Sequence, residues 1–243
     1  MQSSPSSPAL RKLGCLLLCV LVVSGCAASR QARTVEYSGF LADYSKLMPG
    51  MKGDANQVYR GPRAKNQRVF NNYKNIYIDP VSIYRKPSDD RTKLAPKDLE
   101  AIANNFYGML VDALKPDCEI VRKVGLQTLR LTVAFTNAEK DAAVLDTVST
   151  LLPTTLVAST LFSYAADSPG FSGDIAIETR VTDASTGEIV LAPVDRRLGA
   201  KNLSSDLFDK WQMVNNAIAF WSKCQRYQFC KLRGSAGCVA PEA

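Results

Sequence analysis

Histidine is absent from the 243-residue chain, and its absence excludes several classes of site at once. Serine and cysteine hydrolases that activate their nucleophile through an imidazole need it, as do zinc sites with imidazole ligands. A glycine-rich phosphate loop between a strand and a helix is also missing. Any catalysis would have to use carboxylates, lysine or tyrosine, and we predict no enzyme, metal or cofactor.

Cysteine is sparse, with three of the seven residues inside the first 26 positions. Four remain for a folded domain: Cys118, Cys224, Cys230 and Cys238. In an oxidising compartment four thiols can pair in three ways, and the close spacing of the last three predicts a disulfide that staples the C-terminal tail. Free thiols are one alternative. A metal site is another, although C-x5-C-x7-C does not match the paired ligand spacing of zinc knuckles.

Charge is missing from residues 13–25, which directly follow Arg11 and Lys12. A short basic segment, an apolar run too short to span a bilayer, and small residues at its end are typical of an export signal. The run ends in Val23-Ser24-Gly25-Cys26, which resembles the lipobox of bacterial lipoproteins. We therefore predict a lipoprotein signal peptide over residues 1–25.

The lipobox resemblance implies that Cys26 is lipidated with acyl groups such as palmitate and becomes the first mature residue. Two or more acyl chains anchor a protein stably to a membrane. The next residue is alanine rather than aspartate, which by resemblance to lipoprotein sorting implies the outer membrane, and we expect its periplasmic face. Residues 26–37 are predicted to be the lipidated cysteine and a polar tether.

The net charge of +7 is unevenly distributed. Signal cleavage would remove two positive charges and no acid, leaving +5. Residues 46–74 contain a single acid, Asp54, among many basic residues. We predict a loop-rich surface there that contacts anionic headgroups or an envelope protein complex, with a plain solvated loop as the alternative. Nucleic acid is not expected as a partner. The candidate contacts are Lys52, Arg60, Arg63, Lys65 and Arg68.

Hydrophobic periodicity predicts one α+β domain over residues 38–243, with a Cys-containing C-terminal tail. Apolar residues recur at helical spacing between Pro96 and Pro116, and Leu129, Leu131 and Val133 alternate as in a half-buried strand. The expected elements are strands at 76–78, about 118–124 and 129–135, a hairpin over 175–191, and helices at 96–114 and 206–221. Two or three helices against a mainly antiparallel sheet give a two-layer fold.

Residues 38–47 read S-G-F-L-A-D-Y-S-K-L, directly after the tether. This opening, together with segments at 77–81, 129–136, 149–153, 182–188 and 194–197, resembles a family of bacterial lipoproteins catalogued only as a domain of unknown function. The resemblance spans essentially the whole mature chain and implies a location and a common fold, but no activity or catalytic residue. We interpret residues 38–47 as a packing segment over the core, with a binding role as the alternative.

Three further patterns leave alternatives open. Residues 147–166 carry no formal charge but include eight Ser or Thr and Pro153, so we expect a buried segment or an exposed contact rather than a membrane span. Asp174 and Glu178 share a strand face. Asp195-Arg196-Arg197 could bind an anion, although a structural salt bridge at the end of the sheet is the expected role.

These patterns favour a lipid-anchored accessory protein that supports outer-membrane assembly, transport or maintenance by binding. One alternative is a histidine-free hydrolase of cell-wall sugar or lipid that uses carboxylates such as Asp174 and Glu178. Another is a self-assembling lipoprotein ring.

Overall fold

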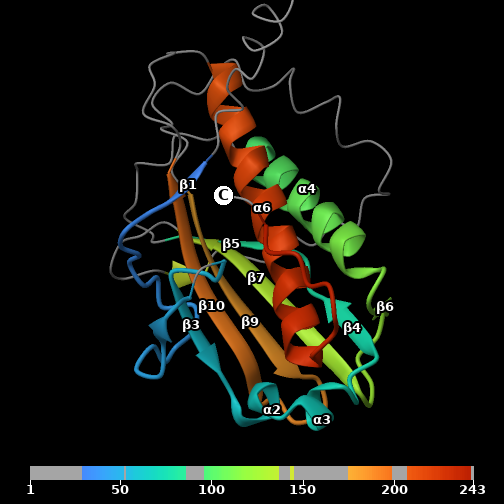
Figure 1. Cartoon of the computed structure of the whole chain (residues 1–243). Helices are drawn as coiled ribbons and strands as arrows, with labels where there is room; N and C mark the ends of the chain where they lie inside the picture. Colours follow the sequence, from blue (N-terminus) through green and yellow to red (C-terminus); the bar gives the residue numbers. More distant parts are fainter. Residues whose placement is uncertain are drawn as a thin grey trace, which may run out of the picture.

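In the described part of the chain, a mixed sheet with two long helices across one face organises the domain (Figure 1). The computed structural model describes residues 29–51, 53–85, 96–136, 143–144, 175–198 and 207–241. Cys26, Lys52, Asp174 and residues 147–166, all singled out from the sequence, lie outside these ranges. The α+β prediction is confirmed.

Ten described strands form the sheet, in the order β2-β3-β10-β9-β7-β4-β6, with β1 also on β10 and β5 joining β7 to β8. The pairs are antiparallel except where β4 meets β6 and β7 and where β5 meets β7, which run parallel. Strand bounds are β1 Arg30–Gln31, β2 Met48–Pro49, β3 Gln57–Arg60, β4 Asn75–Ile78, β5 Ser82–Arg85, β6 Glu119–Ile120, β7 Thr128–Thr136, β8 Ala143–Val144, β9 Ile175–Asp183 and β10 Ile189–Leu198. The helices are α2 Pro62–Lys65, α3 Gln67–Phe70, α4 Pro96–Leu114 and α6 Leu207–Arg233.

The core lies between the sheet and helices α4 and α6. Leu129, Leu131 and Val133 of β7 are buried there as their alternation predicts, and Phe106 and Leu110 of α4 have no exposed surface. Helix α4 has the predicted bounds because its apolar spacing is regular. The hairpin of β9 and β10 is also confirmed.

Helix α6 continues to Arg233, well past the predicted end at residue 221. Beyond Trp221 several of its buried positions are polar, including Ser222, Gln225 and Gln228. A helix face that packs on polar groups lacks the apolar period by which helices are recognised, so the pattern ends before the helix does.

The basic segment, residues 46–74, has more regular structure than its glycines and prolines suggest. It contains the strands β2 and β3 and the short helices α2 and α3. Strand β3 pairs with β10, so part of the expected loop-rich surface belongs to the sheet.

The face of the sheet opposite the helices is covered by residues 35–47. Leu41 is buried against Ala192 and Val194 of β10. Phe40 lies beneath the guanidinium of Arg180, 5.4 Å from its ring centroid. The geometry agrees with a packing segment.

The predicted tether is shorter than residues 26–37, because the chain is already docked at residue 29. Strand β1 pairs with the end of β10, and Ser29 and Ala32 are buried. Their backbone and side-chain groups find partners in the domain, which sequence polarity alone did not reveal.

Two ends of the sheet can be distinguished in Figure 1. At the β1 end, Arg30 lies opposite Leu198, and Ile175 opposite Arg197. The other end holds the β9–β10 turn, α2 and α3. Among the described segments we find no helix whose length and apolar content would suit it to a bilayer.

Candidate anion-binding surface

Glu178, the described member of the carboxylate pair, is fully buried beneath residues 38–44. Its Oε1 accepts the Ser38 backbone N–H at 2.7 Å, and its Oε2 accepts the Tyr44 hydroxyl at 2.6 Å. The Tyr44 oxygen in turn accepts the N–H groups of Gly39 and Leu41. Glu178 therefore holds the S-G-F-L segment onto the sheet, and substrate cannot reach it in this conformation.

The Tyr44 hydroxyl is kept protonated by the same arrangement. Burial, together with the hydrogen bond to the Glu178 carboxylate, raises the pKa of Tyr44 to about 12. A donor that stays protonated stabilises the buried carboxylate across the physiological range.

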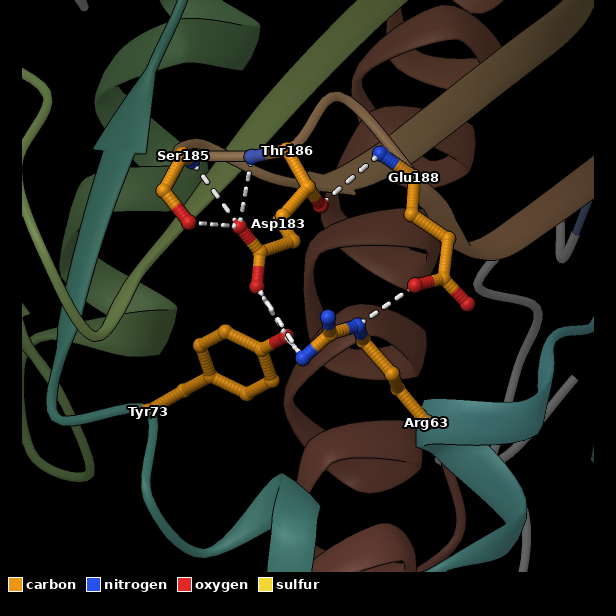
Figure 2. A network of polar contacts seen from close by, with 6 residues as sticks. All are labelled: Arg63, Tyr73, Asp183, Ser185, Thr186 and Glu188. Atoms are coloured by element: carbon orange, nitrogen blue, oxygen red, sulfur yellow. Dashed lines mark hydrogen bonds and ion pairs between the residues drawn. The ribbon is translucent and has the colours of Figure 1, made fainter.

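Arg63, one of the predicted anion contacts, is paired inside the molecule (Figure 2). Its Nε donates to Glu188 Oε2 at 2.6 Å, and its Nη1 lies 3.4 Å from Asp183 Oδ2. The Tyr73 hydroxyl donates to the same Asp183 oxygen at 2.7 Å. The network ties α2 to the β9–β10 turn.

Asp183 shapes that turn through its second oxygen. Oδ1 accepts the Ser185 hydroxyl and the backbone N–H groups of Ser185 and Thr186. Burial on its own would raise the pKa of Asp183, but these bonds and that from Tyr73 outweigh it and hold the pKa below its ordinary value.

Arg60 is neutralised as well. Its Nη2 lies 2.7 Å from Asp54 Oδ2, and Gln228 of α6 donates to the other oxygen of Asp54. Asp54, the only acid of the basic segment, therefore pairs with a basic residue of the same segment. Arg60 contributes to the contact between β3 and α6.

Asp195 and Arg197 point to the helix side of β10 and are almost completely buried. Asp195 accepts hydrogen bonds from Gln31, the Asn56 backbone and Trp221, yet burial keeps its pKa above the ordinary value. The Arg197 guanidinium stacks 3.7 Å from the Phe220 ring centroid. These groups are structural: their partners are Ser29, Gln31, the Asn56 backbone and side chains of α6, rather than a salt bridge at the sheet end.

Lys65 and Arg68, in contrast, are exposed. Four other exposed basic residues lie in the same segment or in segments that form hydrogen bonds with it. Asn71, directly after α3, donates to the Arg233 carbonyl at the end of α6. The Lys74 N–H donates to the Gln127 carbonyl at 3.1 Å, which joins this region to the loop over residues 121–127. We define the basic end by the six exposed cations of these segments: Lys65, Arg68, Lys74, Arg122, Lys123 and Lys231.

Acids are few at the basic end. Residues 65–74, 117–127 and 226–233 together hold eight basic and two acidic residues. Of the two acids, Asp117 is paired with Arg226 at 2.7 Å. None of the six defining cations forms an ion pair within the described part of the chain. Uncompensated cations on one surface attract anions.

Two large apolar side chains project from the same end. Leu126 is 82 % exposed and Val124 is 50 % exposed, and both lie just after Arg122 and Lys123 in the chain. The sequence identified Lys65 and Arg68 but missed the rest of this surface, because its cations come from three segments that only the fold brings together.

The four described cysteines divide into one bridge and two free thiols. Cys230 at the end of α6 is bonded to Cys238, while Cys118 and Cys224 are free. Burial raises the pKa of the Cys224 thiol to about 12 and also raises that of Cys118, which favours the protonated thiol at both positions. No metal-binding group of three or more His, Cys, Asp or Glu side chains is found among the described residues.

A family model described as "Protein of unknown function (DUF3313)" matches residues 36–224. The chain belongs to this DUF3313 family. No curated protein matches it. Two solved structures of PelC dodecamers from Paraburkholderia phytofirmans, one of them a point variant, show 10 % identity. The matches cover 68 % and 67 % of this chain and 89 % and 93 % of the respective PelC chains, with TM-scores of 0.33 and 0.30. A similarity this weak says nothing about the function of this chain.

The DUF3313 match takes in Glu178, Asp195 and most of the basic end. It starts at residue 36, after the docked Ser29 and β1, and ends at residue 224, before Lys231 and the disulfide. Both of the described stretches outside the match nevertheless contact the sheet or the helices, so they are integral to the domain in this chain.

Proposed function

We propose that this DUF3313 protein is a lipid-anchored protein of the bacterial envelope that acts by binding an anionic partner through its basic end. The observation that carries the proposal is the gathering of six exposed cations from three chain segments without acidic partners among the described residues. Their charge is not needed for the described ion pairs of this region, which Arg60, Arg63 and Arg226 supply.

A binding role is favoured over hydrolysis by the state of the described acids. Glu178 is buried and holds two donors, and Asp183 and Asp195 are equally committed to hydrogen bonds. The chain has no histidine that could replace them. We therefore propose an accessory role in outer-membrane assembly, transport or maintenance.

Charge reversal in cells tests the binding role. A variant with Lys65, Arg68, Arg122 and Lys123 each changed to Glu should reproduce the envelope permeability defect of a deletion strain, at an unchanged protein level on immunoblots. The matched control reverses Arg33 and Lys46, which are exposed elsewhere. Wild-type permeability with the four-fold variant, in a background where deletion is harmful, would refute the proposal.

Anchoring is tested separately by Cys26→Ala. The variant should move from the membrane fraction to the soluble fraction after cell lysis, because it loses the acyl chains that hold the protein in the bilayer. Membrane association by the same route without the cysteine would contradict the lipid anchor.

A further inference from the structure

The first described residue of the chain is locked to the β1 end of the sheet. The hydroxyl and the carbonyl oxygen of Ser29 both accept hydrogen bonds from the buried Arg197 guanidinium. Ser29 is 4 % exposed and Arg197 is 1 % exposed. Only two residues separate Ser29 from Cys26.

The residues that follow are held equally firmly. Gln31 Nε2 donates to Asp195 Oδ1 at 2.6 Å and to the Asp54 carbonyl at 3.0 Å. The Ala32 N–H donates to the Arg196 carbonyl at 2.8 Å, and its carbonyl accepts from Asn56 Nδ2 at 2.7 Å. The N-terminal segment is therefore part of the folded body.

This docking limits how far a lipid on Cys26 can be from the β1 end. Three residue steps span at most about 11 Å when fully extended. The nine steps of β10 from Leu198 to Ile189 place the basic end about 30 Å farther along the sheet. An anchor on Cys26 cannot reach the basic end.

We infer that the anchored domain stands with its β1 end on the membrane and presents the basic end, including Val124 and Leu126, to an acidic protein partner on the side away from that membrane. The inference rests on the proposed function, and it names the partner class of the same surface.

The chemistry of the basic end would fit either of two binding partners. Exposed Leu126 and Val124 beside Arg122 and Lys123 would suit an anionic bilayer or a protein interface with an apolar centre and a charged rim. The position of the anchor decides between them, because the membrane that holds Cys26 lies at the opposite end of β10. The complementary surface is an acidic rim around an apolar pocket.

Photo-crosslinking of the full-length protein in intact cells tests this orientation. A benzophenone amino acid is placed at Leu126 or at Arg30, both exposed positions at opposite ends. We expect lipid adducts from Arg30 and one discrete protein adduct from Leu126. The adduct from Leu126 should fall at least about tenfold with Arg122→Glu and Lys123→Glu, because reversed charges oppose an acidic rim. It should be unchanged by Arg33→Glu and Lys46→Glu.

Other results overturn the inference in distinguishable ways. Lipid adducts from both positions would mean that the domain lies flat, which removes the orientation but leaves envelope binding intact. Three results would refute the acidic partner. They are a protein adduct from Leu126 whose yield is unchanged by the charge reversal, an adduct to a second copy of this chain, and the absence of any adduct from Leu126. Absence of lipid adducts from Arg30, together with a soluble protein, would remove the anchor and the proposed function with it.

Discussion

The buried carboxylates Glu178, Asp183 and Asp195 accept most of their hydrogen bonds from neutral donors, several of them distant in the chain. Tyr44, Tyr73 and Trp221 supply one donor each. A buried carboxylate that loses a donor keeps its desolvation cost without compensation. Each of these aromatic donors therefore matters more for stability than its apolar surface suggests.

Tyr44→Phe tests this at the S-G-F-L segment. It removes the hydroxyl bound to Glu178 while keeping the ring that stacks on Tyr37 with centroids 4.3 Å apart. We expect the free energy of unfolding to fall by about 1–3 kcal/mol, measured by urea denaturation. Tyr37→Phe is the control, since Tyr37 is 40 % exposed. Equal losses in the two variants would contradict the role of the hydroxyl.

Asp183→Asn tests the turn through its dependence on pH. Because the folded-state pKa of Asp183 lies below the ordinary 3.8, its charged form stabilises the fold above that pH and the benefit is lost as the pH falls through the folded value. The variant should be less stable than wild type at pH 7, and the difference should shrink below pH 3.8.

Asp112→Asn provides the comparison for that experiment. Asp112 is an exposed carboxylate that pairs with Lys115, and its side chain is 72 % exposed. Its replacement should change the free energy of unfolding little, both at pH 7 and below pH 3.8. A gap between wild type and Asp183→Asn that stays constant as the pH falls from neutral to well below 3.8 would argue against a shifted carboxyl at position 183.

At the scale of elements, the Cys230–Cys238 disulfide joins the end of α6 to the short tail that follows it. The Cys230–Cys238 bridge encloses a separation of eight residues, and Gly234 and Gly237 adopt the positive φ angles that let the chain reverse. The end of α6 also contacts the residue that follows α3, through Asn71 and the Arg233 carbonyl. The bridge thus fixes one border of the basic end.

Cys238→Ser should lower the free energy of unfolding by about 2–3 kcal/mol under oxidising conditions, since the bridge removes the entropy of a short loop from the unfolded chain. Denaturant titrations with and without reductant provide the measurement. Wild type and variant should coincide once the bridge is reduced. A difference that persists in reductant would point to packing of Cys238 rather than to the bridge.

Elements with regular apolar periods were predictable, and those that pack on polar groups were not. Helix α4 and the β9–β10 hairpin follow from spacing alone. The last turns of α6 bury Gln225 and Gln228, which a sequence pattern assigns to solvent. Strand β1 was missed because its pairing partner on β10 lies far along the chain.

The predicted anion contacts show that sequence patterns are limited in the same way for charged residues. The sequence identified a basic segment, but Arg63 is matched by Glu188, 125 residues away. Conversely, Arg122 and Lys123 join Lys65 and Arg68 only through the fold. Local charge asymmetry therefore predicts a charged region without saying which of its residues remain free to bind.

At the scale of the whole molecule, the N-terminal segment behaves as part of the core. A version of the domain that begins at Arg33 lacks Ser29 and Gln31, the partners of buried Arg197 and Asp195. It should be less stable than a version that begins at Ser29 by about 3 kcal/mol or more, because two buried ionisable side chains lose hydrogen bonds. Parallel urea titrations would measure the difference, and equal midpoints would refute the docking.

The contact between Ser29 and Arg197 spans 168 residues, and this separation has a consequence for the order of events during biogenesis. Loop closure over such a distance requires β10 to be present first. If the chain is exported N-terminal end first, as the proposed signal peptide requires, the docking of Ser29 has to wait until β10 has followed. On the proposal of a lipid anchor, acylation and cleavage at Cys26 would precede this docking, and folding would then draw the modified end against the domain that it anchors.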